Sequence, residues 1–158
     1  MSGADTAPAA VVFGCAGLSL TPDEISLFRD CEPAGLILFA RNIDTPDQVR
    51  RLTDVFRDIS GNGKILILID QEGGRVQRRR PPHWPEYPPM RLFGERAALD
   101  GDEAAACVAL NYRLIAADLV TLGINVNCAP VLDLPAEGSH EIIGDRAFSN
   151  DPTLVSTL

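Results

Sequence analysis

The chain has 158 residues, of which 46% are hydrophobic, so it is long enough for one domain with a sizeable core and too short for two ordinary domains. Its 14 Lys and Arg against 22 Asp and Glu give a net charge of −8, which disfavours a protein that binds the phosphate backbone of nucleic acids. No apolar run approaches the roughly 20 residues needed to cross a bilayer, so we expect a soluble protein with no membrane partner.

The cysteines and the N-terminal residues indicate in which cellular compartment the protein is expected. No two cysteines form a C-x-x-C pair, and the first residues, MSGADTAPAA, lack the basic start and long apolar run of a signal peptide. We therefore expect a cytoplasmic protein whose cysteines are reduced and mostly buried as small core residues. They are Cys15, Cys31, Cys107 and Cys128.

The first part of the chain alternates short apolar runs with helix signals. Residues 11–15 and 35–40 are expected to form strands. Each is followed by a Thr-Pro-Asp motif, TPDE at 21–24 and TPDQ at 45–48, in which Thr caps a helix and Pro takes its first position. The second helix is expected to bury one stripe, made of Val49, Leu52, Phe56 and Ile59.

Residues 64–80, KILILIDQEGGRVQRRR, are the most informative segment of the chain. The five consecutive aliphatic residues at 65–69 predict a strand that is buried on both faces, as in a parallel sheet. Asp70 then stands at the C-terminal end of that strand. In parallel sheets and barrels this is the edge at which ligands bind, because the following loops converge there.

The remaining chain alternates long loops with one more helix and strand. Residues 71–100 form a proline-rich connection of a length that favours a functional loop. Residues 124–129 predict a fourth strand, residues 130–150 a second long loop at the same edge, and Asp151 opens a further helix. Between the loops, a helix that begins near residue 100 is expected to bury Val108, Tyr112, Ile115 and Leu119 and to end before Gly123.

Four strand-then-helix units with right-handed crossovers predict an α/β fold with about four parallel strands. A closed (β/α)8 barrel needs eight strands and typically about 250 residues, so residues 1–158 correspond to about the first half of one barrel domain. Such a half-barrel would leave two sheet edges and one inner face uncovered. We expect either a fragment of a longer protein or a half-barrel that associates with another chain through these surfaces.

Polar residues that could carry chemistry follow the third strand. Asp70 and Glu72, next to a glycine pair, can accept hydrogen bonds from sugar hydroxyls, bind a metal ion or transfer protons. In the alternative interpretation Asp70 caps a loop and Glu72 pairs with an arginine, and spacing alone leaves both open. The neighbouring arginines divide between ligand-binding groups and a solvated run, with at least two expected at the surface; they are Arg75, Arg78, Arg79 and Arg80.

The last loop can bring Arg146 to the same site as Asp70, although a structural pair with Asp145 is the favoured interpretation. Asp133 can touch a ligand or hydrogen-bond its own loop, and we favour the structural role. His83 and His140 lack metal-ligand spacing, so we expect no metal site and no catalytic histidine.

Nucleotide-binding and serine-hydrolase signatures are missing from the sequence. There is no G-x-x-x-x-G-K-[ST], no G-x-G-x-x-G and no G-x-S-x-G motif. We expect no nucleotide cofactor.

Five motifs follow one another along the chain: GLILFARN (35–42), IDQEGGRVQR (69–78), YPPM (87–90), NCAPVLDL (127–134) and IGDRAFSNDP (143–152). In this order and spacing, over nearly the whole chain, they resemble the N-terminal barrel domain of family 3 glycoside hydrolases. DQEGGRVQR with IGDRAF is, more narrowly, similar to the bacterial β-N-acetylhexosaminidase branch, which removes N-acetylglucosamine from cell-wall saccharides.

The resemblance implies that Asp70, Arg78 and Arg146 hydrogen-bond the sugar in the −1 subsite. It also implies a retaining glycosidase without cofactor, with an aspartate nucleophile late in the barrel and a His-Asp acid/base after a K-H-F-P-G-H-G motif. The chain stops before either segment, so it receives no catalytic residue and is expected to be inactive alone. Two alternatives remain open: a non-catalytic sugar-binding or assembly half-barrel completed by a partner chain, and a family 3 β-glucosidase.

Overall fold

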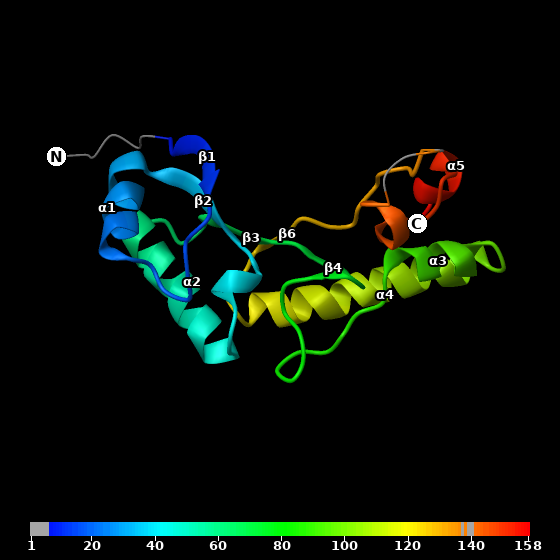
Figure 1. The fold of residues 1–158 in the computed structure, drawn as a ribbon, viewed down its shortest axis with the longest axis horizontal. Coiled ribbons are helices and arrows are strands. Elements are labelled where there is room, and N and C mark those ends of the chain that lie inside the picture. The colour runs from blue at the N-terminus through cyan, green and yellow to red at the C-terminus, as the bar shows by residue number, and fades with distance from the viewer. Residues whose placement is uncertain (1–6, 137, 139–140) are drawn as a thin grey trace. The chain divides into compact units, whose positions relative to one another are not determined.

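The computed structural model describes residues 7–136, 138 and 141–158 (Figure 1). The chain divides into two compact units, and each is described by itself. Unit 1 comprises Met1–Ile69 with Thr121–Val126, and unit 2 comprises Asp70–Val120 with Asn127–Leu158. None of the described helices is long and apolar enough to cross a membrane.

Unit 1 is built on a parallel sheet, which confirms the predicted α/β class. Strand β1 (Ala9–Phe13) pairs with β2 (Pro33–Leu38), and β2 pairs with β3 (Leu66–Ile69), both in parallel. The strand order of the four-stranded sheet is β1-β2-β3-β6, with β6 at Val126–Asn127. The first strand lies two residues earlier than the predicted 11–15.

Two capped helices cover one face of this sheet. Helix α1 (Pro22–Cys31) has the predicted capping box, in which the hydroxyl of Thr21 accepts from the backbone N–H of Glu24 and the Glu24 carboxylate accepts from that of Thr21. Helix α2 (Pro46–Ser60) is capped by the Thr45 hydroxyl, which accepts from the backbone N–H of Gln48, while the Gln48 side chain accepts from the N–H of Asp44. It ends at Gly61, whose φ is 62°. A short 3₁₀ turn, η1 (Ala40–Asn42), precedes it.

Burial in the sheet alternates from residue to residue. Leu36 and Ile67 are fully buried beneath the helices, whereas Leu66 is 41% exposed and Val12 38% exposed on the other face. The expectation that residues 65–69 are buried on both faces is therefore wrong for the described chain. The physical reason is that α1 and α2 cover only one face, where the rings of Phe28 and Phe56 meet edge to face at 5.6 Å.

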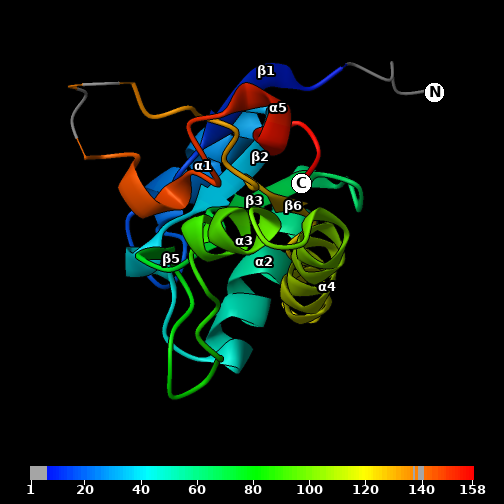
Figure 2. The same cartoon turned by 90° about the vertical axis from the view of Figure 1, so that its right-hand side faces the viewer.

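Unit 2 is organised by two helices that lie side by side (Figure 1 and Figure 2). Helix α3 (Met90–Ala97) packs on α4 (Gly101–Val120), together with the turn η2 (Gly144–Arg146) and the short helix α5 (Pro152–Val155). Their core consists of Met90, Val108, Phe148 and Val155, with Phe93, Tyr112 and Leu158 against it. The predicted buried face of α4 is confirmed, with Tyr112 only partly covered.

The segment predicted as one long loop, residues 71–100, contains regular structure. A hairpin of β4 (Gln71–Gly73) and β5 (Val76–Gln77) follows β3, and α3 comes later. The strands are too short to show a period in the sequence. The N-cap residue of α3 is Pro89, which gives no side-chain hydrogen bond, and the helix contains a glycine, so it lacks the usual start signal.

The predicted fourth strand, residues 124–129, is reduced to β6. The amide side chain of Asn125 accepts from the N–H of Ile67 (2.8 Å) and donates to the carbonyl of Ile65 (2.9 Å). Asn127 makes the same pair of bonds with the backbone of Gln71, at 3.0 and 2.9 Å. Side-chain amides thus replace much of the expected backbone ladder.

Candidate sugar-binding site

A hairpin positions the polar residues that follow strand β3. Asp70 comes directly after the strand, Glu72 lies on β4, and Arg78 follows β5. The fully buried side chain of Gln71 fastens this hairpin, since its Oε1 accepts from the backbone N–H groups of Arg78 and Arg79 at 3.0 and 3.1 Å. The three side chains are therefore held on a rigid element, as a preorganised site requires.

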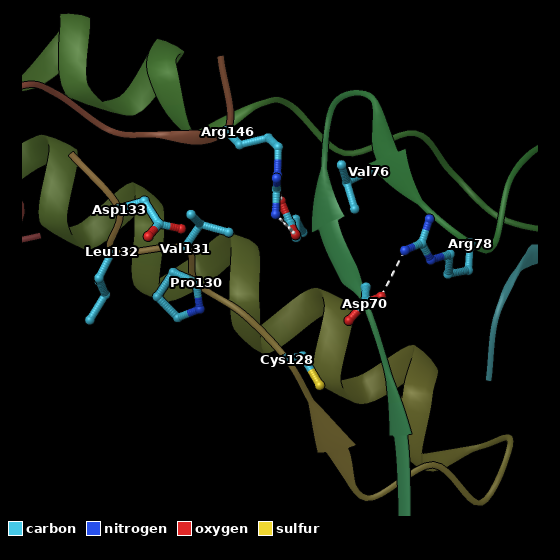
Figure 3. A pocket seen from close by; sticks show the side chains of 10 residues that line it. Asp70, Val76, Arg78, Cys128, Pro130, Val131, Leu132, Asp133 and Arg146 are labelled. Atoms are coloured by element: carbon cyan, nitrogen blue, oxygen red, sulfur yellow. Dashed lines mark hydrogen bonds and ion pairs between the residues drawn. The ribbon is translucent and has the colours of Figure 1, made fainter. Parts of the chain in front are cut away.

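A pocket of about 520 Å³ opens beside the hairpin (Figure 3). This volume lies within the range of small-molecule sites, roughly 300–1,000 Å³. All three residues that the sequence singled out for substrate binding, Asp70, Arg78 and Arg146, line it. The complete lining is Asp70, Glu72, Val76, Arg78, Cys128, Pro130, Val131, Leu132, Asp133 and Arg146.

Two arginine–carboxylate pairs dominate the polar lining. Arg78 Nη2 donates to Asp70 Oδ2 at 2.7 Å. Arg146 binds Glu72 in a bidentate manner, with Nε to Oε2 and Nη2 to Oε1 both at 2.8 Å. The hydrogen bonds to the buried Glu72 raise the pKa of Arg146, so this guanidinium stays charged. The alternative prediction that Glu72 pairs with an arginine is confirmed.

The predicted pair of Asp145 with Arg146 does not form. Asp145 instead binds Arg75, whose Nε lies 3.0 Å from Asp145 Oδ1. The Nη2 of Arg75 also donates to three successive backbone carbonyls, those of Glu141, Ile142 and Ile143, at 2.7, 2.7 and 3.0 Å. Arg75 therefore fixes the loop that carries Arg146.

The last two arginines of the run, Arg79 and Arg80, do not line the pocket. Arg80 is exposed, as is Arg75, which confirms that at least two of the four are at the surface. Arg79 is completely buried, with Nη1 3.6 Å from Asp118 Oδ2 and its guanidinium over the ring of Trp84. Burial lowers its pKa, and Asp118 opposes that shift.

Cys128 is a pocket residue that the sequence did not indicate. Its pKa is raised by burial and by the neighbouring carboxylate of Asp70, so the thiol is neutral. All four cysteines are free, but Cys107 and Cys128 are exposed and only Cys15 is buried. The expectation of mostly buried cysteines is wrong, because α4 turns Cys107 outward and the loop after β6 presents Cys128 to the pocket.

Asp133 also lines the pocket, on the wall opposite Asp70 (Figure 3). Its carboxylate makes no hydrogen bond or ion pair with any residue that the structure describes. The partner needed for the structural role favoured from sequence is thus missing among residues 7–136, 138 and 141–158.

Neither histidine takes part in this pocket. His83 lies in an exposed loop against the edge of Trp84, and His140 lies outside the described residues. Within the described part of the chain, no group of three or more His, Cys, Asp or Glu side chains could hold a metal ion.

Chemically, the pocket combines charged donors and acceptors with apolar walls. Guanidinium groups donate several hydrogen bonds in a fixed plane and carboxylates accept them, which suits an uncharged ligand rich in hydroxyl groups.

A family model described as the glycosyl hydrolase family 3 N terminal domain matches residues 19–158. The chain is 35% identical to a β-hexosaminidase of Xanthomonas euvesicatoria over 148 residues, which covers 94% of this chain and 43% of that protein. It is 36% identical to a β-hexosaminidase of Aromatoleum aromaticum over 151 residues, 94% of this chain and 41% of that protein. The chain thus spans less than half the length of these relatives.

Solved structures give a similar result. NagZ of Neisseria gonorrhoeae in complex with N-trifluoroacetyl-D-glucosamine superposes with a TM-score of 0.87 at 31% identity, over 95% of this chain and 44% of that one. A family 3 β-N-acetylglucosaminidase of Paenibacillus sp. FPU-7 superposes with a TM-score of 0.78 at 34% identity, over 93% and 27%. The similarity therefore extends over nearly the whole described chain.

Proposed function

Because the chain belongs to the family of glycosyl hydrolase family 3 N-terminal domains, we propose that it supplies the sugar-holding residues of a β-N-acetylhexosaminidase. The proposed substrate is a terminal β-linked N-acetylglucosamine. One observation carries this proposal: Asp70, Arg78 and Arg146 converge on one pocket, and each is held in place by a hydrogen bond of 2.7 or 2.8 Å. The complex of NagZ with a glucosamine derivative supports a sugar of this type.

The geometry suits recognition of sugar hydroxyls. Asp70 is an acceptor, and the guanidinium groups of Arg78 and Arg146 are planar donors, so together they can bind neighbouring hydroxyls in one orientation. Glu72 prevents Arg146 from turning away when no ligand is present. Bonds of this kind that strengthen as the ring distorts toward an oxocarbenium-like transition state would also accelerate the reaction.

The bond-breaking groups are proposed to lie outside these 158 residues. In the retaining mechanism expected of the whole protein, an aspartate is the nucleophile and a His-Asp pair the acid/base, and no residue of this chain takes either role. We accordingly expect the 158-residue chain to release no product from a chromogenic β-N-acetylglucosaminide.

We further propose that residues 1–158 are the N-terminal part of one barrel domain and that the whole protein acts in the cytoplasm. Its substrates would be saccharides derived from peptidoglycan, as the DQEGGRVQR and IGDRAF motifs suggest. The uncovered face of the unit 1 sheet supports self-association of the isolated chain.

The sugar site is tested by titrating the chain with methyl β-N-acetylglucosaminide and following its amide resonances by NMR. Arg78→Met removes a pocket donor and should weaken binding about tenfold or more, since a hydrogen bond to a charged group is lost. Arg80→Met is the matched control, because Arg80 lies two residues on and outside the pocket. Equal affinities for the two variants, or no binding by the unchanged chain, would contradict the proposal.

A further inference from the structure

The pocket contains three carboxylates, and they differ in their partners. Asp70 is paired with Arg78 and Glu72 with Arg146. Asp133 has no hydrogen-bond or ion-pair partner among the described residues. An ionised carboxylate accepts hydrogen bonds only, so a ligand that meets Asp133 must present an N–H or O–H donor to it.

The residues around Asp133 restrict which ligand group can donate a hydrogen bond to it. The preceding residues Pro130, Val131 and Leu132 line the same wall of the pocket, whereas Asp70 and Arg78 lie on the facing wall (Figure 3). Val131 is buried, and Leu132 is exposed. A group that fits here combines a hydrogen-bond donor with a small apolar substituent next to it.

A secondary amide has that combination, since its N–H is adjacent to an acyl group that carries a methyl. We propose that Asp133 accepts a hydrogen bond from the N–H of the 2-acetamido group of the sugar, while the apolar wall of Val131 and Leu132 receives the methyl group. This inference rests on the proposed function and adds to it a residue that distinguishes N-acetylglucosamine from glucose.

The discrimination between N-acetylglucosamine and glucose follows from the chemistry of the wall that carries Val131, Leu132 and Asp133. Glucose presents a hydroxyl at the same carbon and brings no methyl group to cover the apolar side chains. Water therefore stays at the wall, and a hydrogen bond from this hydroxyl to Asp133 only replaces one to water, so it adds little affinity. Without an ion pair between them, the charge of Asp133 also adds to the effect of Glu72 in raising the pKa of Arg146.

The test compares the affinities of the chain for methyl β-N-acetylglucosaminide and methyl β-glucoside by amide NMR titration. Asp133→Ala should lower the affinity for the first glycoside about tenfold and change that for the second less than twofold, so that the preference between them is largely lost. Asp133→Asn keeps an acceptor oxygen and should fall between. Asp58→Ala, an exposed aspartate of α2, is the matched control and should change neither.

The outcomes separate the two proposals. If the unchanged chain binds the acetamido sugar and Asp133→Ala binds it equally well in a folded state, shown by an unchanged dispersion of amide resonances, Asp133 has no such role and the sugar site stands. An equal loss of affinity for both glycosides would make Asp133 a general hydroxyl contact and overturn the specificity role. If the unchanged chain binds neither sugar, the proposed sugar site fails and this inference fails with it.

Discussion

Glu72 is the residue on which the orientation of Arg146 depends. Replacing it by Gln keeps the shape but removes the charge, so one of the two hydrogen bonds to Arg146 is lost and a half-buried guanidinium loses its paired carboxylate. We expect Glu72→Gln to lower the free energy of unfolding by about 1–3 kcal/mol. Urea denaturation measures this change. Glu141→Gln, an exposed carboxylate near the same loop, should differ by less than about 0.5 kcal/mol; a similar loss in both variants would contradict the role of Glu72.

Cys15 makes the free energy of unfolding of the chain depend on pH in alkaline solution. Its buried thiol accepts from Asn42 Nδ2 at 3.2 Å, and burial, reinforced by the charge of Glu24, raises its pKa from 9.0 to about 11. The folded state therefore holds this proton more tightly than the unfolded state. The resulting stabilisation is complete below about pH 9 and is lost as the pH rises to about 11, a loss of roughly 2–3 kcal/mol.

This loss is isolated by measuring the free energy of unfolding of the chain and of Cys15→Ala in urea. The measurements are made at pH 8, pH 9.5 and pH 11, about the range over which the thiol ionises. Other groups titrate in both proteins, so only the difference between the two free energies of unfolding reports on Cys15. The advantage of the unchanged chain should shrink steadily across the series. A difference that is constant with pH would show that the thiol pKa is not raised.

Sequence patterns identified residues that line the pocket, but they did not identify which residues these bind within the protein. Asp70, Arg78 and Arg146 were recognised because the motifs around them carry a family pattern, and all three line the pocket. The pairing of Glu72 with Arg146 joins residues 74 positions apart. No spacing rule reaches across such a distance, so the sequence favoured the adjacent Asp145 instead. Cys128 gave no signal, because a single cysteine after a strand is usually a core residue.

At the scale of elements, the contact of α3 with the last loop depends on a glycine. A Cβ atom at Gly94 would lie 1.8 Å from the carbonyl oxygen of Phe148 and 2.6 Å from its carbonyl carbon, which is backbone and cannot rotate aside. Gly94→Ala should therefore cost about 2–3 kcal/mol or more of unfolding free energy, although alanine is the better helix former by about 1 kcal/mol.

The control for this variant is Gly101→Ala. Gly101 also lies in a helix, but an added Cβ there would meet nothing within 4 Å. The two substitutions should shift the thermal midpoint in opposite directions, because only the helix propensity changes at Gly101. A stabilised Gly94→Ala chain would mean that α3 does not rest on the loop at Phe148.

Elements with strong local signals were predicted well, and elements stabilised by distant contacts were not. The Thr-Pro-Asp caps of α1 and α2 were correctly located because Thr21 and Thr45 act within one turn. The β4–β5 hairpin was missed, since it is held by the buried amide of Gln71 and not by an alternating apolar pattern. The predicted fourth strand shrank to two residues, because the amides of two asparagines bind the neighbouring backbone instead.

At the scale of the whole molecule, the uncovered face of the unit 1 sheet should drive association. Val12 pairs with Gly35, and Leu66 pairs with Gly35 from the other side, so these side chains lie on the face that α1 and α2 do not cover. Val12 and Leu66 are both exposed, and Ile37 and Leu68 are only partly buried. A contiguous apolar face of this kind, on a sheet that also has edge strands, favours contact with a second copy.

We therefore expect the weight-average mass of the chain in sedimentation velocity to rise with concentration. Leu66→Lys places a charge at the centre of the face and should shift the distribution toward monomer, because a charged group is costly to bury. Leu99→Lys removes an equally large apolar side chain that is 79% exposed in unit 2, and should leave the association unchanged. A chain that stays monomeric at every concentration, or one that Leu99→Lys disrupts as strongly as Leu66→Lys does, would exclude the sheet face as the surface of association.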